Sequence, residues 1–240
     1  YMRRGLERNE FILHYQPKQD LASGNLNGVE ALVRWQHPQR GLVDPDQFIP
    51  LAEETGLIVD LGRRIIDLAC AQIADWRHAG LALPRVAINV SGVQLIGTQL
   101  VTDLRRALSE HDIPASLLEL EITESGLMND LKTARDILRE LKSMGLSIAI
   151  DDFGTGYSSL SYLDMLPLNK VKIDRSFVRD LTKDAKKLKL LRGVVHLARE
   201  LGLEVVVEGV ETEDQLHMIS DNNCADIIQG YIFGTPMPHG

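Results

Sequence analysis

Short apolar segments rich in β-branched residues recur along the chain and predict β-strands. Such segments are typical of strands when polar turn residues separate them. Eight can be recognised, at residues 11–21, 26–35, 85–91, 117–125, 146–154, 170–178, 204–212 and 227–234. Within several of them apolar and polar residues alternate, so that one face of the strand is polar and the other apolar.

Amphipathic segments between the strands predict helices. Apolar residues recur at helical spacing in 58–76, 129–145 and 184–202. Asn129 is a candidate N-cap, and the last two segments end at Gly145 and Gly202. Strands that alternate with helices favour a parallel sheet, and eight such units in 240 residues predict a single α/β domain, a (β/α)₈ barrel. Only the first two strands are joined by a tight polar connection, SGNLNG, which predicts an antiparallel hairpin.

The polar faces of the strands place acidic and amide side chains at one end of this barrel. The apolar faces are expected to pack against the helices outside, so the polar faces point inward. Because barrel interiors are normally packed, inward charges are expected near the open carboxyl-terminal rim, where active sites of this fold lie. The residues expected to converge there are Glu30, Asn89, Glu121, Asp151, Asp152, Lys172 and Glu208.

Five carboxylates and one amide at a single rim predict a metal site. Taken alone, Asp151 and Asp152 before a glycine-rich turn are typical turn formers. Together with the other three carboxylates they would repel one another in a partly buried site. Oxygen ligands of this kind suit Mg²⁺ or Mn²⁺, and two such ions sharing one aspartate are used for in-line attack on phosphate esters. Arg34, on the same strand face as Glu30, can reach a phosphate oxygen.

Composition narrows the function classes. The net charge of −8 argues against duplex nucleic acid as a partner. No apolar run reaches membrane-spanning length, and the cysteines, Cys70 and Cys224, form no paired motif, which favours free thiols in a reducing compartment. The basic run KDAKKLKLLR is interpreted as a solvated helix face. The chain begins with Tyr1, and residues 1–8 are interpreted as the end of a linker helix from an upstream domain.

Ordered sequence blocks along almost the whole chain resemble the EAL domain of cyclic di-GMP phosphodiesterases. The blocks are YQP (15–17), EALVRW (30–35), FIPLAEETGLI (48–58), NVS (89–91), ELEITES (119–125), IAIDDFGTGYSSL (148–160), KIDRSFV (172–178), VEGVET (207–212) and QGYIFGTPMP (229–238). Val207 is a minor departure, since alanine is common there. The resemblance assigns residues 9–240 to the EAL domain.

This resemblance implies a fold, a reaction and roles for single residues. The first strand of the barrel is expected to be antiparallel to the rest. The expected reaction is hydrolysis of one phosphodiester bond of cyclic di-GMP to the linear dinucleotide pGpG, with two Mg²⁺ or Mn²⁺ ions. The implied metal ligands are Glu30, Asn89, Glu121, Asp151, Asp152 and Glu208, with Asp151 as the bridge. Lys172 falls beside the attacking water, and Gln16, Arg34, Glu211 and Gln229 fall on the substrate side. The proton acceptor is left open between Glu208 and Asp152.

The loop after the two aspartates is expected to link the metal site to a dimer interface. In the family, loop 153–160 leads to a dimer-forming helix, here residues 158–166. Glu124 matches a glutamate that anchors this loop, for example through Thr155 or Ser158, although by itself it reads as a helix-capping carboxylate. The expected setting is a cytoplasmic homodimer without membrane contact, preceded by a sensor or GGDEF domain. The alternatives are a receptor that binds cyclic di-GMP without cutting it and a metallophosphoesterase for another nucleotide.

Overall fold

The structure is a computed structural model that describes residues 1–81, 85–128, 130–154 and 160–238. Its strands and helices follow one another in the order α1 (Met2–Glu7), β1 (Phe11–Asp20), β2 (Leu26–His37), β3 (Gly41–Val43), η1 (Pro45–Gln47), α2 (Ile49–Glu54), α3 (Ile58–His78), β4 (Arg85–Val90), η2 (Gly92–Leu95), α4 (Gln99–Glu110), η3 (Ala115–Leu117), β5 (Leu118–Thr123), α5 (Glu124–Met128), α6 (Leu131–Ser143), β6 (Ser147–Phe153), η4 (Leu160–Met165), β7 (Lys170–Ile173), η5 (Arg175–Phe177), α7 (Ala185–Glu200), β8 (Glu204–Val207), α8 (Glu213–Asp221) and β9 (Ile227–Gln229), where η marks a 3₁₀ helix.

Eight strands close into a barrel, as the sequence predicts. The order β1-β9-β8-β7-β6-β5-β4-β2 is completed by pairing of β1 with β2, and β3 extends β2 outside the ring. β1 is antiparallel to both of its neighbours, whereas the strands from β4 to β9 pair in parallel. The prediction of a (β/α)₈ barrel with an antiparallel first strand is confirmed. The parallel strands therefore end together at one rim.

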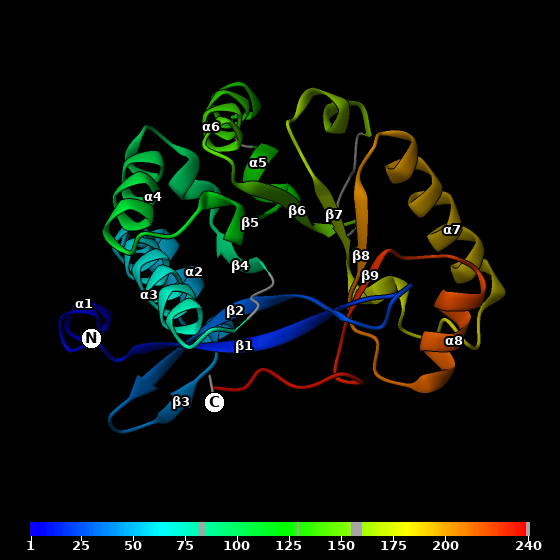
Figure 1. The fold of residues 1–240 in the computed structure, drawn as a ribbon, viewed down its shortest axis with the longest axis horizontal. Helices are drawn as coiled ribbons and strands as arrows, with labels where there is room; N and C mark the ends of the chain where they lie inside the picture. Colours follow the sequence, from blue (N-terminus) through cyan, green and yellow to red (C-terminus); the bar gives the residue numbers. More distant parts are fainter. Residues whose placement is uncertain (82–84, 129, 155–159, 239–240) are drawn as a thin grey trace.

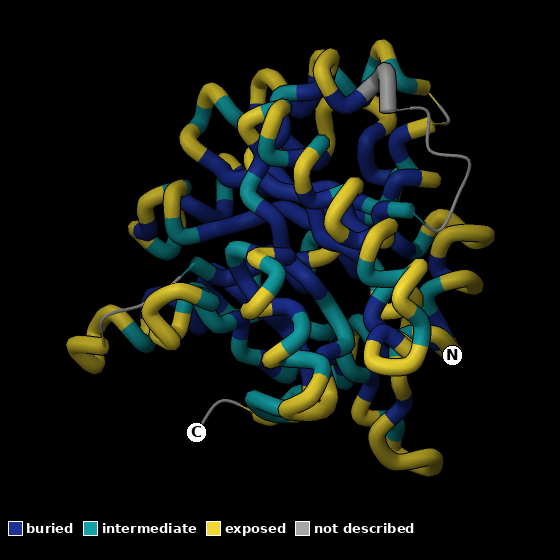
Figure 2. The backbone as a smooth tube through the Cα atoms, turned by 90° about the vertical axis from the view of Figure 1, so that its right-hand side faces the viewer, coloured by how far each residue is buried: buried dark blue, intermediate teal, exposed yellow. Residues whose placement is uncertain are grey.

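The helices cover the barrel from outside (Figure 1). Figure 2 shows that buried residues gather in the interior of the molecule and exposed residues lie on its outside. The three predicted helices are present as α3, α6 and α7. The N-cap of α6 is Asp130, whose side chain accepts a hydrogen bond from the Thr133 backbone N–H, while Asn129 lies outside the described residues. No helix in the described part of the chain has the length and hydropathy needed to cross a bilayer.

The last strands are shorter than the sequence pattern predicts. β7 ends at Ile173 and β8 at Val207 because the chain leaves the sheet at the rim. Asp174 then caps a 3₁₀ turn by accepting a hydrogen bond from the Ser176 backbone N–H. The chain start forms a short helix, α1, and its interpretation as the end of a linker from an upstream domain stays a prediction.

The carboxyl-terminal segment returns to the antiparallel strand. Tyr15 and Met237 exchange backbone hydrogen bonds, with N···O distances of 2.7 and 3.0 Å. In Figure 1 this segment, drawn in red, runs alongside β1. Residues beyond β9 are therefore attached to the strand that carries Gln16, close to the rim.

Candidate active site

Lys172, on β7, lies at the centre of an acidic cluster. Its ammonium nitrogen is 2.6 Å from Glu121 Oε2, 2.7 Å from Glu208 Oε1, 3.2 Å from Asp151 Oδ1 and 3.4 Å from Glu30 Oε2. The side chain is 1 % exposed, so these contacts are shielded from solvent. One lysine therefore gathers carboxylates from four separate strand ends, as the alternation of the strands predicts.

Asn89 joins the same cluster from β4. Its Nδ2 donates a hydrogen bond of 2.6 Å to Glu30 Oε1. With the amide nitrogen held by Glu30, the amide oxygen of Asn89 is left for another partner. This oxygen is the atom through which an asparagine binds a hard cation.

A bulge explains how two adjacent aspartates reach one rim. In a regular strand, Asp151 and Asp152 would point to opposite faces. The pairing of β6 with β7 shifts register between Ile150 and Phe153, and Asp152 has a φ of 55°. Aspartate tolerates this left-handed conformation better than most residues. The Asp152 backbone N–H also donates to Asp151 Oδ1 at 2.9 Å.

The resulting geometry brings three carboxylates together. One oxygen each of Asp151, Asp152 and Glu208 lies within 4.8 Å of the others. Asp151 is buried, whereas Asp152 is exposed. This arrangement can hold a cation between carboxylates from β6 and from the residue after β8, and the bridging role of Asp151 stays a prediction.

The carboxylates of the cluster differ in how strongly their surroundings favour the ionised form. Removal from water would raise the pKa of Glu30, but Lys172, Lys18 and the two amide donors outweigh this and hold it at about 2. Removal from water, and next the Glu30 carboxylate, raise the pKa of Glu121 to about 7. Burial is also the main cause that raises the pKa of Glu208 to about 8, and it raises that of Asp152. Burial and the neighbouring carboxylates therefore disfavour the ionised forms of Glu121, Asp152 and Glu208.

A divalent cation fits this donor set. The ligands on offer are carboxylate oxygens and one amide oxygen, which hard cations such as Mg²⁺ and Mn²⁺ prefer. Positive charge at the rim would also relieve the repulsion that raises the pKa values of Glu121 and Asp152. Among the described residues, the carboxylates of Asp151, Asp152 and Glu208 lie close enough together to share a cation. Glu30, Asn89 and Glu121 lie in the same cluster, and their role as metal ligands stays a prediction.

Two cavities of about 340 Å³ each open beside the cluster and share Leu32 and Asp152. The first has largely apolar walls from α2, α3 and β2, including Ile49 and Ile58. The second has polar walls. Gln16, Glu211 and Gln229, predicted on the substrate side, all line this second cavity, together with Tyr231. An elongated ligand could therefore lie across Asp152 with one end in each cavity.

Arg34 and Glu124 lie apart from these cavities. The Arg34 Nε is 3.2 Å from Asp44 Oδ1, and Arg34 lines neither cavity. Glu124 is 6 % exposed and is the first residue of α5, directly after β5. The loop partners expected for Glu124, Thr155 and Ser158, lie outside the described residues, so its role as a loop anchor stays a prediction.

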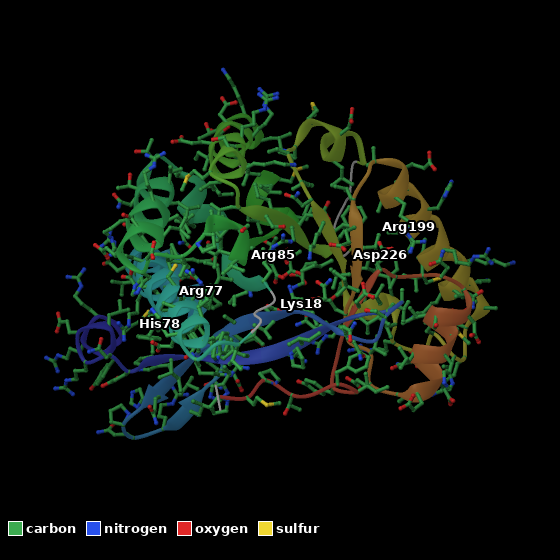
Figure 3. All side chains as sticks on the ribbon, in the orientation of Figure 1. Lys18, Arg77, His78, Arg85, Arg199 and Asp226 are labelled. Carbon is green, nitrogen blue, oxygen red and sulfur yellow. The ribbon has the colours of Figure 1, made fainter. Side chains whose placement is uncertain are left out.

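The sequence pattern did not reveal Lys18 as part of the site. Lys18, labelled in Figure 3, is 2 % exposed. Its ammonium group contacts Glu121 Oε1, whereas Lys172 contacts Glu121 Oε2. It also lies 3.3 Å from Glu119 Oε1, while Lys170 is 3.1 Å from Glu119 Oε2. Positively and negatively charged side chains therefore alternate from Lys172 at the rim down to Lys170 in the barrel interior. The available signal was that Lys18 shares a strand face with Gln16, two residues before it.

Comparisons with known proteins show the family of this chain. The family model of the EAL domain matches residues 2–236. The chain is 46 % identical over 237 residues to MucR of Pseudomonas aeruginosa, which is named as a bifunctional diguanylate cyclase/cyclic di-GMP phosphodiesterase. This alignment covers 99 % of the present chain and 34 % of MucR. The chain is 42 % identical to the cyclic di-GMP phosphodiesterase NbdA of the same organism, with 99 % and 30 % covered.

A solved structure of the PaMucR phosphodiesterase in complex with c-di-GMP superposes with a TM-score of 0.93 at 46 % identity, over 99 % of this chain and 96 % of that chain. The chain belongs to the EAL domain family. It spans about a third of the length of the curated relatives named above.

Proposed function

We propose that this domain hydrolyses cyclic di-GMP to the linear dinucleotide pGpG in a reaction that requires Mg²⁺ or Mn²⁺. The observation that carries the proposal is the convergence of five carboxylates, Asn89 and Lys172 at the rim shared by two cavities. The relatives MucR and NbdA are named as cyclic di-GMP phosphodiesterases, which supports this substrate. The two cavities on either side of Asp152 suit a dinucleotide with one nucleoside in each.

In the proposed reaction, water attacks one phosphorus atom in line with the bond that breaks. The new bond joins the water oxygen to phosphorus, and the bond from phosphorus to the ribose O3′ is broken. The O3′ takes up a proton, and the product is a linear dinucleotide with a 5′-phosphate. Two divalent cations, when bound, would lower the pKa of the attacking water and offset charge on the phosphate oxygens.

The side chains of the rim have separate tasks in this proposal. Lys172 can orient the attacking water or stabilise the charge that develops on the phosphate, because its ammonium group lies among four of the carboxylates that would surround bound cations. The proton acceptor is Glu208 or Asp152, because both line the second cavity and their carboxylates lie together with that of Asp151. Glu211 lines the second cavity as a substrate contact. Arg34 keeps N–H donors beyond the Nε that pairs with Asp44, and these could serve a substrate phosphate.

One incubation tests the proposal and its receptor alternative. Purified, metal-stripped domain is mixed with cyclic di-GMP, with and without added Mn²⁺, and products are separated by chromatography. We expect pGpG only with Mn²⁺, loss of activity in EDTA and recovery with Mg²⁺ or Mn²⁺. Equal activity in the stripped sample would contradict the metal-dependent mechanism. Tight binding of cyclic di-GMP without any product would identify a receptor, and cleavage of another cyclic nucleotide alone would identify a different phosphoesterase.

The assembly is also a proposal. We propose a cytoplasmic homodimer formed through residues 158–166, of which the structure describes the 3₁₀ helix Leu160–Met165, and an upstream sensor or GGDEF domain. The support is the resemblance of the segment and the greater length of MucR, which is named as bifunctional. Sedimentation across a dilution series, with specific activity measured on each sample, tests the dimer. Constant specific activity from dimer to monomer would exclude coupling between assembly and the site.

A further inference from the structure

The carboxylate of Glu30 is held by neutral amides on both oxygens. Asn89 Nδ2 donates to Oε1 at 2.6 Å, and Gln229 Nε2 donates to Oε2 at 2.6 Å. Lys172 is farther from that oxygen, at 3.4 Å. Glu30 itself is 5 % exposed. The nearest fixed donor to Oε2 is therefore Gln229, from β9 on the other side of the antiparallel strand.

Gln229 is in turn held by Gln16. Its Nε2 lies between two acceptors, Glu30 Oε2 and Gln16 Oε1, the latter at 3.0 Å. Two acceptors require the amide nitrogen at this position, which fixes the orientation of the Gln229 amide. Gln16 Nε2 then donates to the backbone carbonyl of Gly234 at 3.2 Å. Gln16 and Gln229 are 7 % and 4 % exposed, so water competes little for these bonds.

The backbone holds both ends of this chain of amides. Gln16 is the antiparallel partner of Glu30, so the register of β1 on β2 sets their separation. Gly230, directly after Gln229, packs so closely that an added Cβ would lie 2.0 Å from the Val210 carbonyl oxygen. Gly234 stands in the segment that the Tyr15–Met237 backbone bonds attach to β1. The chain of amides thus connects the carboxyl-terminal segment to Glu30.

We propose that Gln229 and Gln16 are positioning residues that hold Glu30 in the geometry needed to bind a divalent cation. This inference rests on the metal site of the proposed function. Glu30 and Gln16 already occupy the donor capacity of the Gln229 amide, so a substrate contact, which stays a prediction, would have to use its oxygen. Its Oε1 is buried and has no hydrogen-bond partner among the described residues. Hydrogen-bond partners of metal ligands commonly change metal affinity about 10- to 100-fold when they are removed.

The test measures Mn²⁺ binding to the metal-stripped domain by calorimetry, without nucleotide. For Gln229→Leu we expect an affinity lower by about 10- to 100-fold. For Gln16→Leu we expect a smaller loss. Because Gln16 acts through Gln229, the double variant should bind Mn²⁺ no more weakly than Gln229→Leu alone, a non-additivity that general damage to the fold would not produce. The matched control is Gln99→Leu, the same substitution at a glutamine on α4 that bonds to Asp103 outside both cavities, and it should keep the Mn²⁺ affinity within about twofold.

The outcomes separate this inference from the proposed function. If the wild type binds no Mn²⁺, the metal site and the positioning role both fail. If the wild type binds Mn²⁺ and Gln229→Leu binds it equally well, the positioning role alone is overturned, and weaker binding of cyclic di-GMP by that variant would make Gln229 a substrate contact. Circular dichroism checks folding. If Gln229→Leu does not fold, Gln229→Met, which keeps the length of the side chain, is measured in its place with the same criterion.

Discussion

The ammonium nitrogen of Lys18 lies 3.3 Å from Glu119 Oε1 in the interior of the barrel, beneath the candidate metal site. Barrel interiors of this fold are mostly filled by branched apolar side chains. Here burial would lower the pKa of Lys18, but nearby carboxylates outweigh this and raise it, so that the lysine is charged when the protein is folded. Removing one partner of a buried ion pair is strongly destabilising, because the other charge is left buried without compensation.

We therefore expect Lys18→Met to destabilise the domain by about 3–5 kcal/mol, because it leaves buried carboxylates short of a cation. Urea unfolding followed by circular dichroism measures this loss. The double variant Lys18→Met/Glu119→Gln removes a charge of each sign and should recover part of it. The control Lys189→Met, on the exposed face of α7, should stay within about 0.5 kcal/mol of the wild type. Equal stability of Lys18→Met and the control would show that the interior charges are not coupled.

Asp151→Asn is expected to change activity and metal-free stability in opposite directions. The variant removes a predicted bridging ligand, so hydrolysis should fall by orders of magnitude. In EDTA it also removes one charge from a cluster in which Asp151 helps to raise the pKa values of Glu121 and Glu208. The Asp152 backbone N–H keeps an acceptor in the asparagine oxygen.

The metal-free Asp151→Asn domain should therefore melt about 2–4 °C higher than the wild type, which corresponds to about 1 kcal/mol in a domain of this size. Thermal denaturation in EDTA and in excess Mn²⁺ measures both states, and the advantage should disappear in Mn²⁺. A lower melting temperature in EDTA would mean that Asp151 stabilises the fold through Lys172 more than it repels its neighbours.

Lys172→Met is expected to separate binding from cutting. Lys172 lies at the centre of the cluster, where its charge helps most when negative charge develops on the phosphate. Turnover of cyclic di-GMP in Mg²⁺ should fall about 100-fold or more, while affinity measured by calorimetry with Ca²⁺, which is expected to slow turnover, should change much less.

The control for this experiment is Lys170→Met. Lys170 lies on the same face of β7, but it contacts Glu119 and Glu204 rather than the rim. Once folding is verified, its turnover should stay near that of the wild type. Equal losses of turnover and affinity in Lys172→Met would assign Lys172 to ground-state binding of the substrate instead.

The sequence predicts the barrel and most of the rim because both follow from simple periodicity. Alternation within single strands places Glu30, Asn89, Glu121 and Lys172 inward, and parallel pairing brings their strand ends together. Asp152 is harder to place, since alternation alone turns it away from Asp151. A register shift and a φ of 55° decide its direction, and no local pattern predicts either.

Other features depend on contacts between distant segments. Lys18 meets Glu119 and Glu121 only because β1 enters the barrel in the antiparallel sense, which sets its height relative to β5. The sequence pattern places inward charges near the rim, whereas Glu119 and Lys170 lie beneath it. β3 is only three residues long and exists through its pairing with β2, so periodicity cannot reveal it. The ion pair between Arg34 and Asp44 likewise depends on the loop after β3.

The interior charges also predict how the domain responds to acid. Burial would raise the pKa of Glu119, but Lys18, Lys170 and the Ser147 hydroxyl outweigh it and lower the pKa from its ordinary 4.5 to about 2. A carboxyl whose pKa is lower in the folded state stabilises the fold above its ordinary pKa, and this contribution is lost as the pH falls through the folded value. For Glu119 the loss should therefore develop between about pH 4.5 and pH 2 and should amount to about 3 kcal/mol.

The variant Glu119→Gln lacks this ionisable carboxyl and so cannot lose its stabilising contribution in acid. Its free energy of unfolding should fall less steeply over that range than that of the wild type, although the variant is less stable at neutral pH. Urea unfolding at a series of pH values, with the exposed-site variant Glu140→Gln as the control, measures the two slopes. If Glu119→Gln and the wild type lost stability in parallel, the ion pairs of Glu119 would contribute nothing to folding, and the charges in the barrel would have to be balanced elsewhere.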